Sequence, residues 1–250
     1  MFTLRAALLA IALLAMPTAA SADEFNPKQR DEIGAIVRDY LLKHPEVLLE
    51  VSKELDKRQA QAESEQNKAA LAANANQIFR SPDDFVAGNP KGDVTIVEFF
   101  DYNCPWCKKS MPILKQLMES DKGVKLVLKE FPILGEGSEY AARAAIAAMA
   151  QGKYLEFHIA LYEHEGKIDA GVVDRIAQSM SLDVARMKAD MNSPATANII
   201  SRNQQLAQML GINGTPGFVI DQEIIPGFVP AKQLSVSVQN VRDSGGCKLC

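Results

Sequence analysis

Cysteine is scarce in this chain, and where the few cysteines fall is informative. The 250 residues contain four, which form two C-x-x-C pairs: Cys104 with Cys107, and Cys247 with Cys250. A small disulfide-stapled scaffold distributes cysteines through its loops, whereas the long segment between these two pairs has none. The sequence therefore excludes a disulfide-rich fold and favours a redox use of the first pair.

Excess positive charge and long apolar runs are also missing. The chain has 27 basic and 31 acidic residues, which gives no indication of a nucleic-acid partner or a membrane-surface partner. Its one early apolar run, residues 6–16, is too short to span a bilayer. Arg5 precedes this run and an Ala-x-Ala site ending at Ala22 follows it, which predicts a removable signal peptide over residues 1–22. We therefore expect a cleaved, exported protein.

Residues 23–84 differ in composition from the rest of the chain. Apolar residues recur at helical spacing in two short stretches, Ile33, Ile36, Val37, Tyr40 and Leu41, then Val47, Leu48, Val51 and Leu55. Two such helices cannot bury a core by themselves. We expect residues 23–55 to be a helical oligomerisation segment and residues 56–84 a helical stalk or linker. The alternative is a helical hairpin that packs on its own catalytic domain.

The remainder alternates strands and helices. Strands are predicted at 94–100, 124–131, 217–220 and 223–225, and helices at 105–120, 138–151, 154–164, 170–179, 183–191, 194–210 and 230–242. This order predicts an α/β catalytic domain over residues 85–243 with a helical insertion at about 135–210. Residues 244–250 are expected to form a flexible tail that carries the second cysteine pair.

The first pair lies where an apolar strand ends and a helix begins, in the sequence Cys104-Pro105-Trp106-Cys107. A thiol at a helix N-terminus faces unpaired N–H groups and the positive end of the helix dipole, and both favour the thiolate. We therefore expect Cys104 to be acidic, exposed and nucleophilic. Cys107, one turn later and more buried, would then resolve the mixed disulfide.

Two further features accompany this pair. Glu98 is a carboxyl group inside the otherwise apolar strand, suited to proton exchange with Cys107, or else exposed at a sheet edge. Pro216 stands just before a predicted strand in Gly214-Thr215-Pro216-Gly217, which indicates a forced turn with a cis Thr215–Pro216 bond.

These motifs resemble the DsbA family of bacterial periplasmic thiol–disulfide oxidoreductases. The resemblance rests on residues 97–107, on Gly214-Thr215-Pro216 and on residues 131–143, and the helical segments at 36–42 and 44–48 are most similar to the ScsC (suppressor of copper sensitivity C) type. It implies a thioredoxin-like fold with an inserted helical domain, an attacking Cys104 and a resolving Cys107. It also implies that Pro216 lies against the active site, lined by Pro105 and Trp106, and that Thr215 provides part of an edge for an extended substrate.

The resemblance carries expectations about direction and partners. Strong DsbA oxidants have histidine in place of Trp106 and tend to have valine in place of Thr215, so we expect a less oxidising pair and favour an isomerase or reductant over an oxidase. Clients would be unfolded or misdisulfided exported proteins, served by a homodimer or homotrimer in the periplasm. Recycling would use a membrane partner of DsbD type, or of DsbB type for an oxidase.

The ending Ser244-Gly245-Gly246-Cys247-Lys248-Leu249-Cys250 departs from the family pattern. A glycine hinge would let Cys247 and Cys250 act as a second redox pair that exchanges with the first. Alternatively, the two pairs together supply four thiolates, which suit copper or zinc and would make the chain a metal-handling protein. The third interpretation is an idle, locally oxidised tail. The redox-active disulfide itself needs no cofactor.

Overall fold

The structure, a computed structural model, describes residues 25–250, and the predicted signal peptide lies outside them. The chain divides into two compact units, with the boundary between Gln59 and Ala60. That boundary falls inside helix α2 (Glu46–Ala73), which follows helix α1 (Pro27–Lys43). Among the described residues, no helix has both the length and the apolar character needed to cross a membrane.

The first unit is helical and exposes its apolar side chains. A capping box starts α1: the Asn26 side chain accepts from the Gln29 N–H, and the Gln29 side chain accepts from the Asn26 N–H. No residue of α1 is buried, and the exposed apolar side chains of the unit include Ile36, Tyr40, Leu48, Val51 and Leu55. Apolar side chains that share one helical face and remain exposed to water favour association with another apolar surface.

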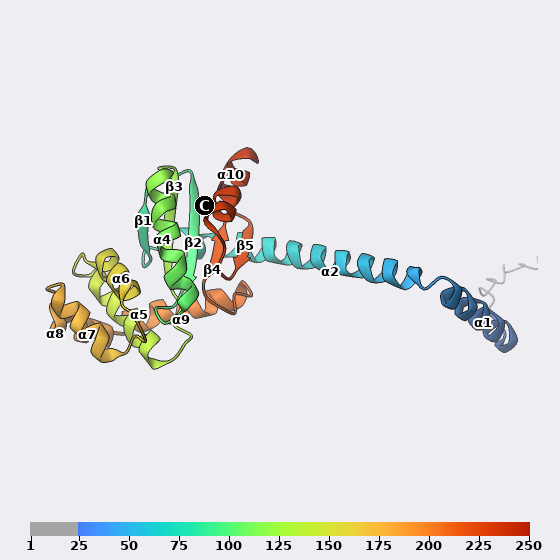
Figure 1. The fold of residues 1–250 in the computed structure, drawn as a ribbon, viewed down its shortest axis with the longest axis horizontal. Coiled ribbons are helices and arrows are strands. Elements are labelled where there is room, and N and C mark those ends of the chain that lie inside the picture. Colours follow the sequence, from blue (N-terminus) through green and yellow to red (C-terminus); the bar gives the residue numbers. More distant parts are fainter. Residues whose placement is uncertain (1–24) are drawn as a thin grey trace, which may run out of the picture. The chain divides into compact units, whose positions relative to one another are not determined.

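A five-stranded mixed sheet forms the centre of the second unit (Figure 1). Its strands lie in the order β1-β3-β2-β4-β5, with bounds Phe85–Gly88, Val124–Glu130, Val94–Phe100, Gly217–Ile220 and Glu223–Pro226. β2 pairs parallel with β3 and antiparallel with β4, and all seven of its residues are buried. The central strand is thus the one that ends at the first cysteine pair.

Eight further helices complete the described part of the second unit. They are α3 (Ala75–Phe79), α4 (Pro105–Ser120), α5 (Glu136–Met149), α6 (Tyr154–Glu163), α7 (Ala170–Ser179), α8 (Val184–Met191), α9 (Pro194–Met209) and α10 (Ala231–Asp243). Helices α5 to α9 fall between β3 and β4, as the predicted insertion requires, and α5 to α8 gather beside the sheet (Figure 1). One core joins the sheet to α4, α10 and the insertion, and a second core lies on the opposite face of the sheet.

The second core shows that the catalytic unit begins earlier than the predicted residue 85. Leu71, near the end of α2, is fully buried there together with Ile78 and Phe79 of α3. Strand β1 was also absent from the prediction, because its four residues, Phe85–Gly88, are too few to show a period in the sequence. The predicted stalk therefore supplies part of the catalytic core. The sequence did not show this, because the few apolar residues of the stalk are scattered through a stretch rich in Lys, Gln and Ala.

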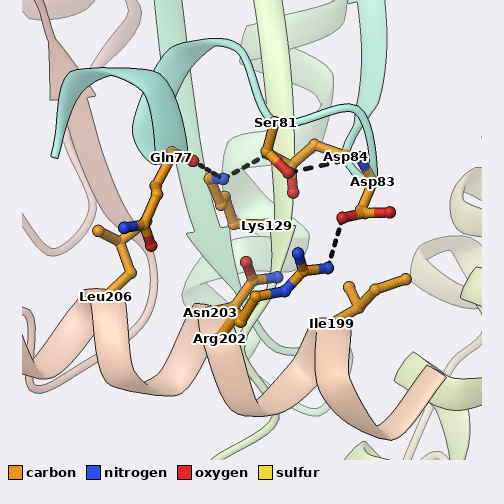
Figure 2. Close-up of a pocket in the computed structure, with 9 residues that line it drawn as sticks. All are labelled: Gln77, Ser81, Asp83, Asp84, Lys129, Ile199, Arg202, Asn203 and Leu206. Atoms are coloured by element: carbon orange, nitrogen blue, oxygen red, sulfur yellow. Dashed lines mark hydrogen bonds and ion pairs between the residues drawn. The ribbon is translucent and has the colours of Figure 1, made fainter. Parts of the chain in front are cut away.

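A buried ion pair, with an exposed one beside it, fixes the segment after α3 to this face of the sheet. Figure 2 shows the cavity in which Lys129 of β3 meets Asp84 and the carbonyl group of Gln77, while Arg202 of α9 pairs with Asp83. Burial lowers the pKa of Lys129 and raises the pKa of Asp84. Removing one partner of such a pair leaves an uncompensated buried charge, so the buried pair specifies where this segment lies.

Replacing Leu71 with alanine tests whether the end of α2 belongs to the catalytic core. Leu71→Ala removes a fully buried side chain, and we expect it to lower the free energy of unfolding of this unit by about 2–5 kcal/mol. Trp106, the single tryptophan of the chain, reports unfolding by urea through its fluorescence. The control, Leu49→Ala, changes an exposed leucine of the same helix and should cost less than about 0.5 kcal/mol. Equal losses in the free energy of unfolding for the two variants would show that the end of α2 is not part of this core.

Candidate active site

The first cysteine pair lies at the start of α4, directly beyond the central strand. Cys104 is the N-cap residue of α4, and Pro105 occupies the first turn, where a missing N–H costs no helical hydrogen bond. Cys107 follows one turn later, and both cysteines are free thiols in this structure. The predicted placement of the pair at a strand-to-helix junction is confirmed.

Cys104 has the more acidic thiol of the two. The hydrogen bond from the Cys107 thiol is the largest influence that lowers the pKa of Cys104, to about 6, and the Thr215 side chain and the amides of the first turn also lower it, against the effect of burial. The Cys104 Sγ lies 3.1 Å from the Thr215 carbonyl oxygen. The helix N-terminus thus contributes less than the neighbouring thiol. The prediction of an exposed sulfur is wrong: Cys104 is only 3% exposed, because it packs into the core beside Thr215.

Cys107 is fully buried and remains a thiol. Burial raises the pKa of Cys107 far above its ordinary value, and the hydrogen bond to Cys104 and the charge of Glu98 raise it further. The two sulfurs therefore differ strongly in acidity. Cys104 carries the negative charge, and Cys107 donates the proton that stabilises it.

Glu98 lies on the same face of β2 as Ile96 and Phe100, inside the core and not at an edge of the sheet. It is only 2% exposed, and burial, followed by the charge of Cys104, raises the pKa of Glu98 to about 8. Its Oε1 has no hydrogen-bond partner among the described residues. A protonated carboxyl group at neutral pH fits this surrounding, and it can release or take up a proton near the physiological range.

The loop before β4 closes the other side of Cys104. Its Thr215–Pro216 peptide bond is cis, as predicted from the sequence. Gly217, the first residue of β4, lies so close to Ile212 that an added Cβ would come within 2.7 Å of a methyl group. An open groove runs beside this loop, lined among others by Glu63, Asn67 and Thr215. The end of α2 thus contributes side chains to the surface next to Cys104.

Exposed apolar side chains lie on the segments next to the cysteine pair. Trp106 is half exposed, with its ring 5.4 Å from that of Phe228, and the Lys109 ammonium lies 4.3 Å above the indole. Ile133 and Leu134 are also exposed, on the segment that leads into the insertion. Exposed apolar groups around a reactive sulfur suit the binding of unfolded chains, which expose apolar residues of their own.

Asp101 joins the active-site loop to the helical insertion, a role the sequence reasoning missed. One carboxylate oxygen, Oδ1, accepts from the Asn103 backbone N–H and the Ser138 hydroxyl, both at 2.7 Å. The other, Oδ2, accepts from the backbone N–H groups of Ile133 and Leu134 at 2.8 and 2.9 Å. The acidic residue directly after the strand was the available signal, but three of its four partners lie more than thirty residues away.

A second buried polar cluster lies between the sheet and the insertion. The Glu130 carboxyl accepts from the hydroxyl groups of Tyr102 and Tyr154, at 3.0 and 2.7 Å. His158 contacts the Tyr102 hydroxyl at 3.0 Å, and burial lowers the pKa of His158 to about 3, so its ring stays neutral. These residues fix the insertion to the sheet.

The second cysteine pair does not join the first. Cys247 and Cys250 are disulfide-bonded to each other, and Cys250 Sγ lies 4.0 Å from the carbonyl oxygen of Thr95, near the start of β2. Cys104 lies beyond the other end of β2, and Thr95 to Phe100 alone spans roughly 17 Å of extended strand. The prediction of a flexible tail is therefore wrong, since residues 247–250 are docked on the sheet. A single site of four thiolates, or direct exchange between the pairs, is incompatible with this position.

Comparison with known families gives two matches. The family described as DSBA-like thioredoxin domain matches residues 95–239, and the family described as copper resistance protein ScsC N-terminal domain matches residues 29–62. The first match extends from β2 to α10 and includes both Cys104 and the cis-proline loop. The predicted thioredoxin-like fold with an inserted helical domain is thereby confirmed.

Individual relatives agree with this assignment. A thioredoxin-like oxidoreductase from Silicibacter pomeroyi is 48% identical and covers 67% of this chain and 97% of its own, with a TM-score of 0.66. Proteus mirabilis ScsC in a transitional conformation is 28% identical and covers 88% of this chain and 98% of its own, with a TM-score of 0.64. The probable disulfide bond formation protein D of Bacillus cereus is 27% identical over 63% of this chain and 80% of its own length.

The curated relatives that the chain matches first are Na⁺/H⁺ antiporters named NhaA, and the chain spans only about a quarter (24%) of their length. The matched part is 63% and 62% of this chain. The likeness to these antiporters is therefore limited to one domain that they share with this chain. With a family match over more than half of its residues, the chain belongs to the DSBA-like thioredoxin domain family.

Proposed function

We propose that this protein exchanges disulfides in other exported proteins through Cys104, and that it acts as an oligomeric isomerase or reductant. One observation carries the proposal: two neighbouring free thiols, Cys104 and Cys107, have pKa values shifted in opposite directions. An attacking thiolate beside a protonated resolving thiol is the arrangement that thiol–disulfide exchange requires.

The exchange proceeds in two steps. The Cys104 thiolate attacks a client disulfide, forms a mixed disulfide and releases the other client sulfur as a thiolate. Cys107 then loses its proton and attacks Cys104, which releases the reduced client and leaves a Cys104–Cys107 disulfide. Glu98 can accept the Cys107 proton once its own proton has gone to solvent. Formation of the mixed disulfide favours that release, because it removes the Cys104 charge that helps to raise the Glu98 pKa to about 8.

Client binding is assigned to the loop beside Cys104 and its apolar surroundings. The Thr215 carbonyl oxygen already lies at the sulfur, and the neighbouring groove is open to an extended segment. Pro105 and Trp106 line the opening, and the exposed indole offers an apolar contact of low specificity. These features favour a broad range of unfolded or misdisulfided clients.

Trp106 favours isomerase or reductant activity over oxidase activity. Its indole lies against Phe228 and beneath Lys109, and it brings no cationic charge to Cys104. A less stabilised thiolate makes the disulfide less oxidising. The oxidase of DsbA type remains the second candidate. A Cys104 pKa of about 6 still stabilises the thiolate of the reduced protein, and this makes the Cys104–Cys107 disulfide more oxidising than that of an ordinary cysteine pair.

The apolar face of α1 and early α2 supports self-association into a homodimer or homotrimer. Its side chains lie uncovered by the described part of the chain, and this region matches the ScsC N-terminal domain. Several catalytic units in one assembly could bind one misfolded client together. Export to the periplasm, with a membrane reductant of DsbD type to recycle Cys104, completes the proposal.

Refolding of scrambled ribonuclease tests the function. The full chain without residues 1–22 should restore ribonuclease activity, and deletion of residues 23–59 should reduce the rate several-fold while Cys104 still reduces insulin. The deletion stops at Gln59 because Leu71, Ile78 and Phe79 belong to the catalytic core. Cys104→Ser is the inactive control, and sedimentation gives the number of chains per particle.

Two results would contradict this assignment. Equal reshuffling by both forms would remove the need for an oligomer. Faster dithiol oxidation by the shortened form, with reshuffling by neither, would make the protein an oxidase.

Alkylation by iodoacetamide tests the ionisation of Cys104. The rate for the reduced protein should rise with pH through a midpoint near 6 and level off by pH 8, because the thiolate alone reacts. Mass spectrometry should find the label on Cys104 and not on Cys107. A midpoint near ~8.5, as for an ordinary cysteine, would remove the proposed nucleophile.

Replacing Glu98 with glutamine tests the proton transfer. Glu98→Gln keeps the size of the side chain but cannot exchange a proton, so we expect release of glutathione from a Cys104 mixed disulfide to slow by roughly 10²-fold. The alkylation rate of Cys104 in the free reduced protein, which reports only on its thiolate, should change little, and this comparison separates proton transfer from misfolding.

The same variant should change how stability depends on pH. The folded protein keeps the Glu98 proton up to about pH 8, whereas the unfolded chain loses it near 4.5, so the wild-type carboxyl contributes stability at low pH that is lost between these values. Glu98→Gln should remove this loss in urea unfolding curves. An unchanged pH dependence together with an unchanged release rate would exclude Glu98 from the chemistry.

A further inference from the structure

The C-terminal cysteine pair is held by a carboxylate at the turn between β4 and β5. Asp221 Oδ1 accepts from the backbone N–H groups of Lys248 and Leu249, both at 2.8 Å. The Arg80 guanidinium donates to the carbonyl oxygens of Leu249 and Cys250 at 2.6 and 3.0 Å. Asp221 and Arg80 thus hold the backbone of the tail from two sides, through hydrogen bonds that do not involve the sulfur atoms.

This arrangement brings three potential metal ligands together. One ligand atom each from Asp221, Cys247 and Cys250 lies within 4.8 Å of the others, and Cys247 Sγ is 3.5 Å from Asp221 Oδ1. The Asp221 side chain is buried, and its second oxygen, Oδ2, makes no hydrogen bond to any residue that the structure describes. This carboxylate oxygen has no partner in the described part of the chain and belongs to the same group of potential ligands as the two sulfurs, so it is available to a metal ion.

We propose that Cys247 and Cys250, once reduced, bind one zinc ion together with Asp221. A dithiol donor supplies two electrons and two protons, which break the Cys247–Cys250 disulfide and leave two thiols. Zinc then displaces both thiol protons and is itself neither oxidised nor reduced. Two thiolates and one carboxylate occupy three positions of a tetrahedral site, and water fills the fourth.

The donor set selects the class of metal. Thiolates bind zinc and cuprous ions well and bind magnesium or calcium poorly, since those ions require oxygen ligands. The carboxylate distinguishes zinc from a cuprous ion, which two thiolates suffice to hold. Cys250 also donates its backbone N–H to Cys247 Sγ at 3.3 Å, a contact that stabilises negative charge on this sulfur.

The site is separate from the disulfide exchange proposed for Cys104. It lies at the opposite end of β2, so a bound ion leaves the first pair accessible. Zinc would hold the tail pair in its reduced form, and oxidation of the pair would release the ion. The second C-x-x-C would then be a redox-gated zinc site and not a second exchange centre.

Zinc titration of the reduced full-length protein tests this site. Cys104→Ser/Cys107→Ser removes the active-site thiols, a phosphine reduces the tail, and a chromophoric chelator competes for the ion under anaerobic conditions. We expect one zinc per chain in the reduced form and none after oxidation. Cys247→Ser/Cys250→Ser in the otherwise wild-type chain should lose that one equivalent, which provides a second variant should the first fail to fold.

Asp221→Asn tests the carboxylate itself. Asparagine tolerates the positive φ of 49° at this position and can still accept the tail N–H groups, so the docking is preserved while the charged ligand is lost. We expect zinc affinity to fall at least about tenfold. The control, Glu223→Gln, removes an exposed carboxylate from the same hairpin and should leave affinity unchanged.

Three results would overturn the proposal. They are no zinc in the reduced protein, zinc retained without Cys247 and Cys250, and equal affinity in Asp221→Asn. The last would also be the result for a cuprous-type site of two sulfurs. None of them bears on Cys104, so failure of this site is distinguishable from failure of the proposed function.

Discussion

The geometry of the active site depends on the hydrogen bonds that the Asp101 carboxylate accepts. Its two oxygens accept four hydrogen bonds, from the loop that precedes Cys104 and from the first residues of the helical insertion. Without it, partly buried backbone N–H groups and the buried Ser138 hydroxyl would lose their partner, and a polar group left unpaired away from water is destabilising. Asp101 therefore holds the active-site loop against the start of the insertion, beside the buried cluster of Glu130, Tyr102 and His158 that fixes the insertion to the sheet.

Within that frame, three titratable groups determine the chemistry together. Cys104, Cys107 and Glu98 share a nearly dry environment in which negative charge is costly, so the charge settles on the sulfur that has the most hydrogen-bond donors. Each remaining proton is then held more tightly because Cys104 is charged. When Cys104 enters a mixed disulfide its charge disappears, and both neighbours lose a proton more readily. The attack by Cys104 thus itself prepares Cys107 for the second step.

The sequence was sufficient for elements whose signals are local. The apolar strand before Cys104, the helices of the insertion and the cis bond at Pro216 could all be predicted from neighbouring residues. Leu71 could not be placed, because one apolar residue in a polar helix does not say what it packs against. Asp101 and Asp221 were missed for another reason: most of their partners are backbone N–H groups at positions far along the chain, and every residue but proline has such a group.

The docked tail shows why equal spacing does not imply equal chemistry. In the first pair, donors point at a sulfur: the Cys107 thiol and the amides of the first helical turn stabilise the Cys104 thiolate with no cation present. In the second pair, the amides of Lys248 and Leu249 point instead at the Asp221 carboxylate. Two thiolates there would lie beside a third negative group, an arrangement that repulsion disfavours unless a cation is shared between them. The first C-x-x-C therefore supports a free thiolate, whereas the second supports either a disulfide or a metal ion.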